Sequence, residues 1–398
     1  MLKIGLDNAQ PGMTLALDIP HPQQPSQVLL RSGVQLTQRI VDHLRRTSVR
    51  SIWIACPNGD DDAVLLDVHI LDAFKGIVDI VGKTFDELDD GPVPKFPLTQ
   101  YSTAISALID AVVNNPQAAF LAIDLFDFAA RPIVRHSAVV TYLSVLMGLK
   151  LEGYLIRQRK RLHPERAREV TNLGVGAMLH DVGLTRLDAE VVERYEATGD
   201  ERDVQWQEHP SLGYDMVHGK VHAVAATIVL NHHQRFNGSG YAGGGRRALG
   251  GDQIHVFSRI VGLAETFDRL VHPVDGSVRP AVAALSSLLG PIERSRFDDQ
   301  VLRALLAVVP AYPSGHVVRL SDERWAVPVR YHHVDPCRPV VRVIGDPSKL
   351  DPDQPILGEE IDLSEPTRTP LSIVHFDGAD TEPFNFAAPD LMAEVALM

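Results

Sequence analysis

Five histidines and two carboxylates carry the metal chemistry that this sequence could support. They are His136, His180, Asp181, His209, His232, His233 and Glu265. Neutral imidazole and carboxylate groups are ligands of Fe, Mn and Zn, and the lack of a cysteine cluster argues against a structural zinc site. One carboxylate such as Asp181 can bridge two ions, and two ions about 3.5–4 Å apart can hold both oxygens of a phosphoryl displacement. The residue types therefore indicate metal-assisted phosphoryl chemistry.

These residues fall at the ends of predicted helices or inside them. His136 lies in the first turn of one helix, and the pair His180–Asp181 ends an apolar helical run. His209 lies at a helix start, His232–His233 ends a further helix, and Glu265 lies within another. Apolar residues recur at helical spacing over residues 63–84, 105–113, 120–128, 133–149, 151–161, 167–179, 211–217, 221–230, 254–270, 281–289 and 299–308. The sequence thus predicts a mainly α-helical core that could gather the ligands.

The remaining segments divide the chain into a helical domain with β-rich flanks. The predicted parts are a small β-rich module at 1–57, a linker and helix at 58–100, the helical domain at 101–310, a small β extension at 311–364, and a flexible tail at 365–398. Strands are expected at 13–19, 27–30, 49–55, 316–320, 324–331 and 340–344, a helix at 38–46, and loops at 86–97 and 237–251. The N-terminal module at 1–57 carries no chemistry of its own.

Composition excludes several classes of protein. The chain has 398 residues and a formal net charge of −13, so its overall field repels phosphate polymers and no nucleic-acid polymer is expected as a partner. The two cysteines, Cys56 and Cys337, cannot build a disulfide framework, which favours a reducing cytoplasm. No segment has the form of a signal peptide, and none reaches the roughly 18 uninterrupted apolar residues of a membrane span. These patterns predict a cytoplasmic protein.

The order of the histidine motifs resembles the HD-GYP family over roughly residues 100–310. The matching motifs are His136-Ser137, His180-Asp181-Val182-Gly183, His209-Pro210, His232-His233 and Asn237-Gly238-Ser239-Gly240-Tyr241. That family consists of bacterial phosphodiesterases of the second messenger cyclic di-GMP, built on the all-helical HD-superfamily fold. The resemblance implies the same fold and a cyclic dinucleotide substrate here.

The resemblance also implies a binuclear metal site, with Fe or Mn as the expected ions. One ion would be held by His136, His180, Asp181 and Glu265, where the family usually has Asp in place of Glu265. The second would share Asp181 and use His209 and His232, with His233 close to it or on an adjoining site. Some members bind a third ion through a Glu one turn before the first His, but Pro132 stands there, so two ions are expected.

The same resemblance assigns roles in catalysis and substrate binding. His180 and Asp181 are the expected catalytic residues, and Gly240, Tyr241 and Arg235 are the expected substrate-binding residues. The metal ligands match the family better than the substrate-binding residues do.

Several positions depart from the family pattern. Leu184 replaces the Lys of the H-D-x-G-K motif, which the family uses to contact substrate phosphate or metal-bound solvent. Ala242 replaces the Pro of G-Y-P, and Asn237 and Gln234 replace acidic residues. The family's basic R-P-Y-R patch is reduced to a segment around His272. Loss of one such cation is comparable to loss of an oxyanion-hole donor, on the order of 10²–10³ in rate.

Three hypotheses for function therefore stand. The first is a cyclic di-GMP phosphodiesterase of bacterial signal transduction, with activity weakened by the departures. The second is a catalytically degenerate module that binds metal, nucleotide or another signalling protein without turnover. The third is an HD-superfamily phosphohydrolase acting on nucleoside triphosphates or alarmones, which the extra His209 and His232–His233 disfavour.

Overall fold

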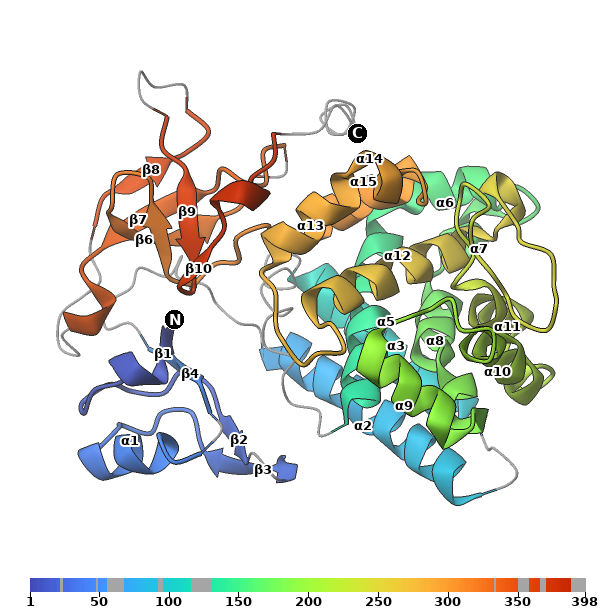
Figure 1. Ribbon diagram of the computed structural model, residues 1–398, viewed down its shortest axis with the longest axis horizontal. Coiled ribbons are helices and arrows are strands. Elements are labelled where there is room, and N and C mark those ends of the chain that lie inside the picture. The colour runs from blue at the N-terminus through green and yellow to red at the C-terminus, as the bar shows by residue number, and fades with distance from the viewer. Residues whose placement is uncertain are drawn as a thin grey trace.

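A computed structural model describes residues 1–21, 24–47, 49–55, 68–91, 96–115, 131–332, 334–349, 358–365 and 370–387. A helical domain occupies one side of the molecule, and β segments from both ends of the chain occupy the other (Figure 1). The confirmed fold class is mainly α, with an all-helical core and small β-rich terminal segments.

The helical domain is built from helices of very different lengths. They are α2 (Val68–Asp90), α3 (Leu98–Asn114), α5 (Pro132–Lys150), α6 (Glu152–Gln158), α7 (Pro164–Ala167), α8 (Thr171–Leu179), α9 (Ala189–Thr198), α10 (His209–Val217), α11 (Ala223–Asn231), α12 (Val256–Val271), α13 (Ala281–Leu289), α14 (Pro291–Arg294) and α15 (Asp299–Val308). Two 3₁₀ segments, η3 (Val182–Arg186) and η4 (Trp206–Glu208), lie between helices near the predicted ligands.

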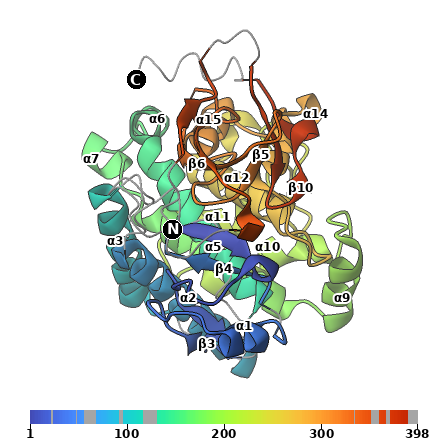
Figure 2. The ribbon, with the colours of Figure 1, turned by 90° about the vertical axis from the view of Figure 1, so that its left-hand side faces the viewer.

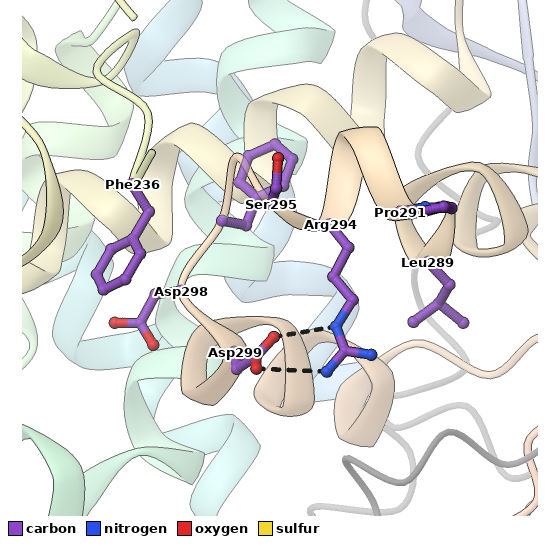
Figure 3. Close-up of a pocket in the computed structure, with 8 residues that line it drawn as sticks. Phe236, Leu289, Pro291, Arg294, Ser295, Asp298 and Asp299 are labelled. Atoms are coloured by element: carbon purple, nitrogen blue, oxygen red, sulfur yellow. Dashed lines mark hydrogen bonds and ion pairs between the residues drawn. The ribbon is translucent and has the colours of Figure 1, made fainter. Parts of the chain in front are cut away.

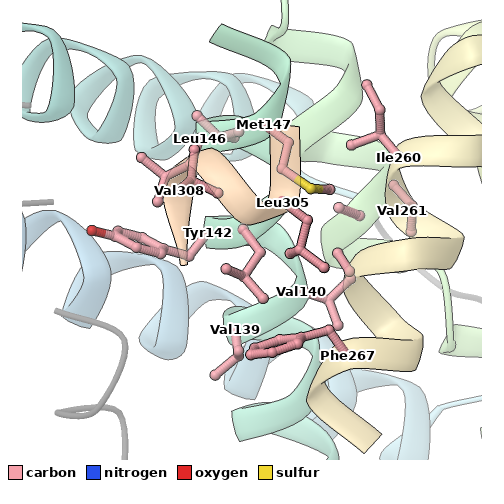
Figure 4. Close-up of a cluster of buried hydrophobic side chains, with 14 of the residues drawn as sticks. Val139, Val140, Tyr142, Leu146, Met147, Ile260, Val261, Phe267, Leu305 and Val308 are labelled. Carbon is pink, nitrogen blue, oxygen red and sulfur yellow. The ribbon is translucent and has the colours of Figure 1, made fainter. Parts of the chain in front are cut away.

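Helix α5 is the centre of the domain. It starts with Pro132, whose missing N–H suits a first helical turn, and nearly all of its side chains from Val134 onward are buried. α2, α8, α12 and α15 pack around it. Its Val140 and Met147 meet Ile260 and Leu305 of the surrounding helices in one apolar cluster (Figure 4). A helix covered on all sides in this way fixes His136, near its start, in the interior.

The same helix is long and apolar enough to pass a length-and-composition test for a membrane span. However, 78% of that window is buried inside the protein. The apolar character of α5 is therefore explained by its place in the core.

The C-terminal β segment is a six-stranded antiparallel sheet with the strand order β10-β9-β5-β6-β7-β8. The strands are β5 (Val318–Leu320), β6 (Trp325–Arg330), β7 (Val340–Ile344), β8 (Glu360–Asp362), β9 (Ile373–Phe376) and β10 (Ala379–Asp380). The N-terminal module pairs β1 (Leu2–Gly5) with β4 (Ser51–Ile54) and β2 (Ile19–His21) with β3 (Gln24–Leu30), and carries helix α1 (Gln38–Leu44).

The two ends of the chain share one hydrophobic core. Leu2, Ile4 and Ile52 of the N-terminal module cluster with Val327 and Ile344 of the C-terminal sheet. The Lys3 amide also donates a hydrogen bond to the Gly315 carbonyl at 2.7 Å. Figure 2 shows these β segments together in front of the helical domain. The β-rich flanks therefore form one joint unit beside the helices.

The structure differs from the predicted elements in several places. The expected loop at 86–97 is wrong at its start, because α2 continues to Asp90 and buries Phe85 and Leu88. The predicted strand at 13–19 is reduced to isolated bridges at Thr14 and Leu15. The predicted helix at 167–179 is broken between α7 and α8, and α9 and α14 were not predicted.

The C-terminal end differs as well. Part of the segment expected to be a flexible tail forms β9 and β10, and Ile373 and Phe376 of β9 are buried. The expected helix at 120–128, residues 63–67 of the expected helix at 63–84, and residues 388–398 of the expected tail lie outside the described residues.

Candidate metal centre

Helix ends bring the predicted ligands together. His180 follows the last residue of α8, His232 follows the last residue of α11, and His209 follows η4 at the start of α10. α5 contributes His136 from its first turns, and α12 contributes Glu265. All of these side chains are buried, with the exposed fraction of His136, the highest, at 6%.

A repeated hydrogen bond fixes the orientation of three of the histidines. The last carbonyls of a helix lack intrahelical partners, so a side chain that follows can donate to them. The Nδ1 atoms of His180, His209 and His232 donate to the carbonyl three residues earlier, at 2.8, 2.7 and 2.9 Å. Because a carbonyl only accepts, each neutral ring keeps its proton on Nδ1 and presents an unprotonated Nε2.

His136 is oriented by a carboxylate instead. Its Nδ1 donates to Asp268 Oδ2 at 2.6 Å, so its Nε2 is also free of a proton. This arrangement of a ring held by a carboxylate on one nitrogen is common for metal-binding histidines, because it raises the basicity of the other nitrogen.

Asp181 lies where these Nε2 atoms converge. Its Oδ2 is 3.4 Å from His180 Nε2 and 3.6 Å from His136 Nε2. Its Oδ1 is 3.5 Å from His209 Nε2 and 3.6 Å from His232 Nε2, and has no hydrogen-bond donor among the described residues. Each oxygen of one carboxylate thus faces a different pair of imidazoles.

Within each pair the nitrogen lone pairs face each other. The Nε2 atoms of His136 and His180 are 3.3 Å apart, and so are those of His209 and His232. With both protons on Nδ1, neither contact can be a hydrogen bond, and the facing lone pairs repel unless a cation lies between them. The donor set therefore fits two cations, one on each side of Asp181.

Glu265 and His233 complete the two donor sets. His136, His180 and Glu265 form one group whose ligand atoms lie within 4.8 Å of one another, and Asp181, His209, His232 and His233 form another. Glu265 Oε1 is 3.4 Å from His233 Nε2, while Oε2 has no hydrogen-bond partner among the described residues. Burying a carboxylate that is only partly paired costs free energy unless a cation binds it. The burial of Glu265 therefore also supports a site for two cations.

Burial keeps most of the centre in the protonation state that a metal requires. Burial lowers the pKa of His209 to about 4 and lowers the pKa values of His136 and His233, so these rings are neutral at pH 7. Burial opposes ionisation of Asp181, but the charges of the neighbouring His180 and Arg269 hold the pKa of the carboxyl well below its usual range, and Asp181 in turn raises the pKa of His180 against the effect of burial. Neutral imidazole around an ionised carboxylate is the ligand set of Fe, Mn or Zn.

Glycines allow the backbones that carry the ligands to approach closely. A Cβ on Gly183 would lie 1.9 Å from the His209 carbonyl oxygen, and a Cβ on Gly262 would lie 2.3 Å from that of His232. A Cβ on Gly240 would lie 2.3 Å from the His233 carbonyl oxygen. Gly240 is therefore needed for packing behind the histidine pair, and a substrate contact through it stays a prediction.

The other two expected substrate-binding residues also lie against the histidine pair. The Tyr241 ring stacks on His233, with centroids 4.6 Å apart and planes 15° apart, and its hydroxyl has no partner among the described residues. Arg235 is buried, and its Nη1 donates to the His232 carbonyl oxygen at 3.0 Å. A free tyrosine hydroxyl is compatible with substrate binding, whereas Arg235 supports the backbone of a ligand.

Leu184, at the position of the family lysine, belongs to a small apolar cluster. It packs with Leu187 against Val191, Tyr195 and Trp206. This position therefore contributes no cation to the centre.

Two further residues belong to the centre: Asp268, which the sequence pattern missed, and Arg269, which the sequence offered only as an ion-pair partner of Glu265. Asp268 orients His136 and also accepts a hydrogen bond from His272 Nδ1 at 2.9 Å. Arg269 pairs with Asp181 and with Glu265. Glu265, Asp268 and His272 are spaced by three and four residues, so they share one face of α12, and this spacing was the signal that could have found Asp268.

Asp268→Asn tests the role assigned to Asp268. Burial opposes ionisation of Asp268, but hydrogen bonds from His136 and His272 lower its pKa, so the carboxylate is charged at neutral pH. The amide keeps the shape but not the charge, and we expect the affinity for Mn²⁺ to fall about 10- to 100-fold. Isothermal calorimetry measures this, and an unchanged affinity would show that the contact is only structural.

A separate pocket lies at the junction of α13, α14 and α15 (Figure 3). Phe236, Leu289 and Asp298 line it, and an ion pair between Arg294 and Asp299 spans part of it. None of the predicted ligands lines this pocket, and Asp298 is already held by Arg259 at 2.8 Å. The chemistry of the molecule is therefore assigned to the metal centre.

Comparison with known proteins agrees with this geometry. The HD domain family model matches residues 150–301. A cyclic di-GMP phosphodiesterase of Pseudomonas aeruginosa is 25% identical over 91% of this chain and 88% of its own length. The cyclic di-GMP phosphodiesterase response regulator RpfG of Xanthomonas campestris pv. campestris is 36% identical, over 35% of this chain and 36% of its own length.

A third relative is a cyclic di-GMP phosphodiesterase of Vibrio cholerae serotype O1. It is 30% identical over 33% of this chain and 28% of its own length. The similarity to the Pseudomonas protein extends over both β-rich flanks, whereas the other two matches each cover about a third of this chain. Residues 150–301 thus match an HD domain, and the named relatives together with the His–Asp centre support an HD-GYP family member.

Proposed function

We propose that this protein is a metal-dependent phosphodiesterase that hydrolyses cyclic di-GMP in the bacterial cytoplasm. The observation that carries the proposal is the position of Asp181, whose two oxygens each face a pair of unprotonated imidazole nitrogens. The names of the three relatives support the same substrate.

The residues would hold two divalent ions, for which Fe or Mn is the expected identity. One ion would be held by His136, His180 and Glu265, and the other by His209, His232 and His233. Asp181 would be a ligand of both ions. Such a pair, when bound, neutralises charge on phosphoryl oxygens and makes water a stronger nucleophile at neutral pH. In the hydrolysis, water oxygen bonds to phosphorus, the bond from phosphorus to the 3′ oxygen breaks, and that oxygen takes up a proton.

The protein's own groups orient the ligands for this reaction. Three histidine rings are fixed in one tautomer by hydrogen bonds to the backbone carbonyls of Ala177, Trp206 and Val229. Asp268 fixes the fourth ring, that of His136. Such preorganisation means that the ligands need not be reoriented when charge develops on the phosphate.

A catalytically degenerate module is the second candidate, and the observation that favours it is Leu184. Its side chain is committed to an apolar cluster with Tyr195 and Trp206. In that case the centre would bind ions and nucleotide without turnover, and could act through another signalling protein.

A hydrolysis assay separates the two candidates. Protein loaded with Fe²⁺ or Mn²⁺ is incubated with cyclic di-GMP, and products are separated by chromatography. The proposal expects a linear dinucleotide or GMP from the wild type and no product from His180→Ala. Tight binding of cyclic di-GMP by calorimetry, with no product from metal-loaded protein, would replace the phosphodiesterase by the degenerate module.

Metal removal gives a test that does not require turnover. Ions that bind only the folded state stabilise it by about 2.7 kcal/mol at a concentration 100 times the Kd. We expect chelation with EDTA to lower the melting temperature on the order of 5 °C, and Mn²⁺ to restore it. A melting temperature that responds neither to EDTA nor to Mn²⁺ would argue against ions in the buried centre.

A further inference from the structure

Arg269 places a guanidinium directly on the metal centre. It lies one helical turn after Glu265 on α12, and its Nε donates to Glu265 Oε1 at 3.0 Å. Its Nη2 donates to Asp181 Oδ2 at 3.2 Å. The two carboxylates that it contacts are those assigned to the two ions. Among the described side chains that pair with Asp181 or Glu265, Arg269 is the one that is not a histidine.

Tyr195 of α9 holds the outer side of the same guanidinium. Arg269 Nη1 donates to the Tyr195 hydroxyl at 2.9 Å, and the guanidinium carbon is 5.4 Å from the centre of the Tyr195 ring. Tyr195 in turn stacks on Trp206, with centroids 3.6 Å apart and planes 6° apart. The position of Arg269 is therefore fixed by both carboxylates and by an aromatic pair.

The guanidinium connects the buried ligands to solvent. The Arg269 side chain is 21% exposed, whereas those of Asp181 and Glu265 are 0% and 1% exposed. Three of its five N–H groups are used by Glu265, Asp181 and Tyr195, which leaves one N–H on each Nη without a partner among the described residues. Paired N–H groups of arginine match two oxygens of a phosphate.

Position 184 carries no charge in this chain. Leu184 replaces the lysine that, by resemblance, contacts the substrate phosphate, and it packs in the cluster that contains Tyr195. Tyr195 thus belongs to the cluster against which Leu184 packs, and it also contacts the arginine on the metal centre.

We propose that Arg269 binds a phosphate of the substrate at this centre and supplies the positive charge that the family lysine would supply at position 184. This inference rests on the proposed function for the identity of the substrate. The ligand chemistry itself is a phosphate oxyanion.

Arg269 and the ions share the same carboxylate oxygens, and this gives the inference a distinctive signature. Removal of the guanidinium frees Asp181 Oδ2 and Glu265 Oε1 and removes a repelling charge, so divalent ions should bind more tightly. A phosphate, in contrast, loses a charged hydrogen-bond donor and should bind more weakly. A residue that only organised the carboxylates would, when removed, weaken the binding of both.

The experiment measures Mn²⁺ affinity by calorimetry and then the affinity of Mn²⁺-loaded protein for inorganic phosphate. Arg269→Gln should bind Mn²⁺ at least as tightly as the wild type and bind phosphate about 10- to 100-fold more weakly. Arg269→Lys, which keeps the charge, should recover part of the phosphate affinity. Tyr195→Phe removes only the outer hydrogen bond, and it tests the anchoring if Arg269→Gln does not fold. Arg194→Gln on α9, which removes an exposed guanidinium bound to Asp203, is the matched control.

The outcomes separate this inference from the proposed function. Weaker phosphate binding by Arg269→Gln, with Mn²⁺ affinity at or above that of the wild type, supports the role of Arg269 even if the wild type does not hydrolyse cyclic di-GMP, whereas weaker binding of both ligands overturns it. If the wild type hydrolyses cyclic di-GMP, and Arg269→Gln leaves both phosphate affinity and kcat/KM unchanged, the inference is overturned while the proposed function stands. Weaker Mn²⁺ binding with unchanged phosphate affinity, or no phosphate binding by the wild type, also overturns it.

Discussion

Asp181→Asn is expected to abolish metal binding at one or both sites and to lower turnover of cyclic di-GMP by on the order of 10³ or more. The carboxylate is the one group that faces all four imidazoles His136, His180, His209 and His232. An amide carries no charge, and only its oxygen can act as a ligand, so it cannot bridge two cations. Its NH₂ group would also face unprotonated imidazole nitrogens and could donate to them.

The fold should survive this substitution, because the side chains have nearly the same shape. The amide can donate to the facing nitrogens that repel one another, which offsets the loss of the ion pair with Arg269, so the melting temperature without metal should stay close to that of the wild type. Metal content by plasma mass spectrometry, melting temperature and turnover are measured together. Asp188→Asn, an exposed aspartate just before α9, is the matched control and should leave all three unchanged. Full turnover by Asp181→Asn would contradict the central role given to this carboxylate.

Gly183→Ala is expected to destabilise the helical domain by about 3 kcal/mol and to disrupt the centre at the same time. The added Cβ would lie 1.9 Å from the His209 carbonyl oxygen and 2.6 Å from the Gly213 nitrogen. Both are backbone atoms of α10, so no flexible side chain can move aside. η3 would have to separate from α10, and this movement would increase the distance between Asp181 and His209.

Urea denaturation and Mn²⁺ calorimetry check this expectation. Gly76→Ala is the matched control, because Gly76 lies within α2 and a Cβ there has nothing within 4 Å. That change should be neutral or stabilising by up to about 1 kcal/mol, as expected for Gly to Ala inside a helix. A Gly183→Ala protein with wild-type stability and metal affinity would mean that α10 and η3 are less closely packed than the structure shows.

The sequence predicted the gathering of the ligands because helix ends and histidines coincide along it. A run such as 171–179 that stops at His180–Asp181 marks a helix end, and the family spacing connects it with His136 and His209. The Nδ1 hydrogen bonds to preceding carbonyls follow from that same position at a helix end. These features are local, so sequence alone can indicate them.

The roles of Asp268 and Arg269 depend on which helices pack together. Arg269 could be recognised as a partner of Glu265 four residues earlier, but its contact with Asp181 joins residues 88 positions apart. The hydrogen bond between Asp268 and His136 spans 132 positions. Such contacts are set by the packing of α12 on α5, which the apolar periodicity of each helix does not specify.

The terminal β strands were partly missed for a related reason. β1 pairs with β4 about fifty residues later. The side chains of β1 also cluster with Val327 and Ile344, which come from the other end of the chain. The short strands β9 and β10 lie in a segment rich in Pro and Asp, whose composition is typical of loops. Pairing with β5 gives β9 its place in the sheet, and a single short segment does not reveal that pairing.

Anomalous diffraction from crystals of the Mn²⁺-loaded protein tests the central claim most directly. We expect two peaks on either side of Asp181, one bordered by the Nε2 atoms of His136 and His180 and the other by those of His209 and His232. No peak at this position, in crystals that bind Mn²⁺ elsewhere, would contradict it.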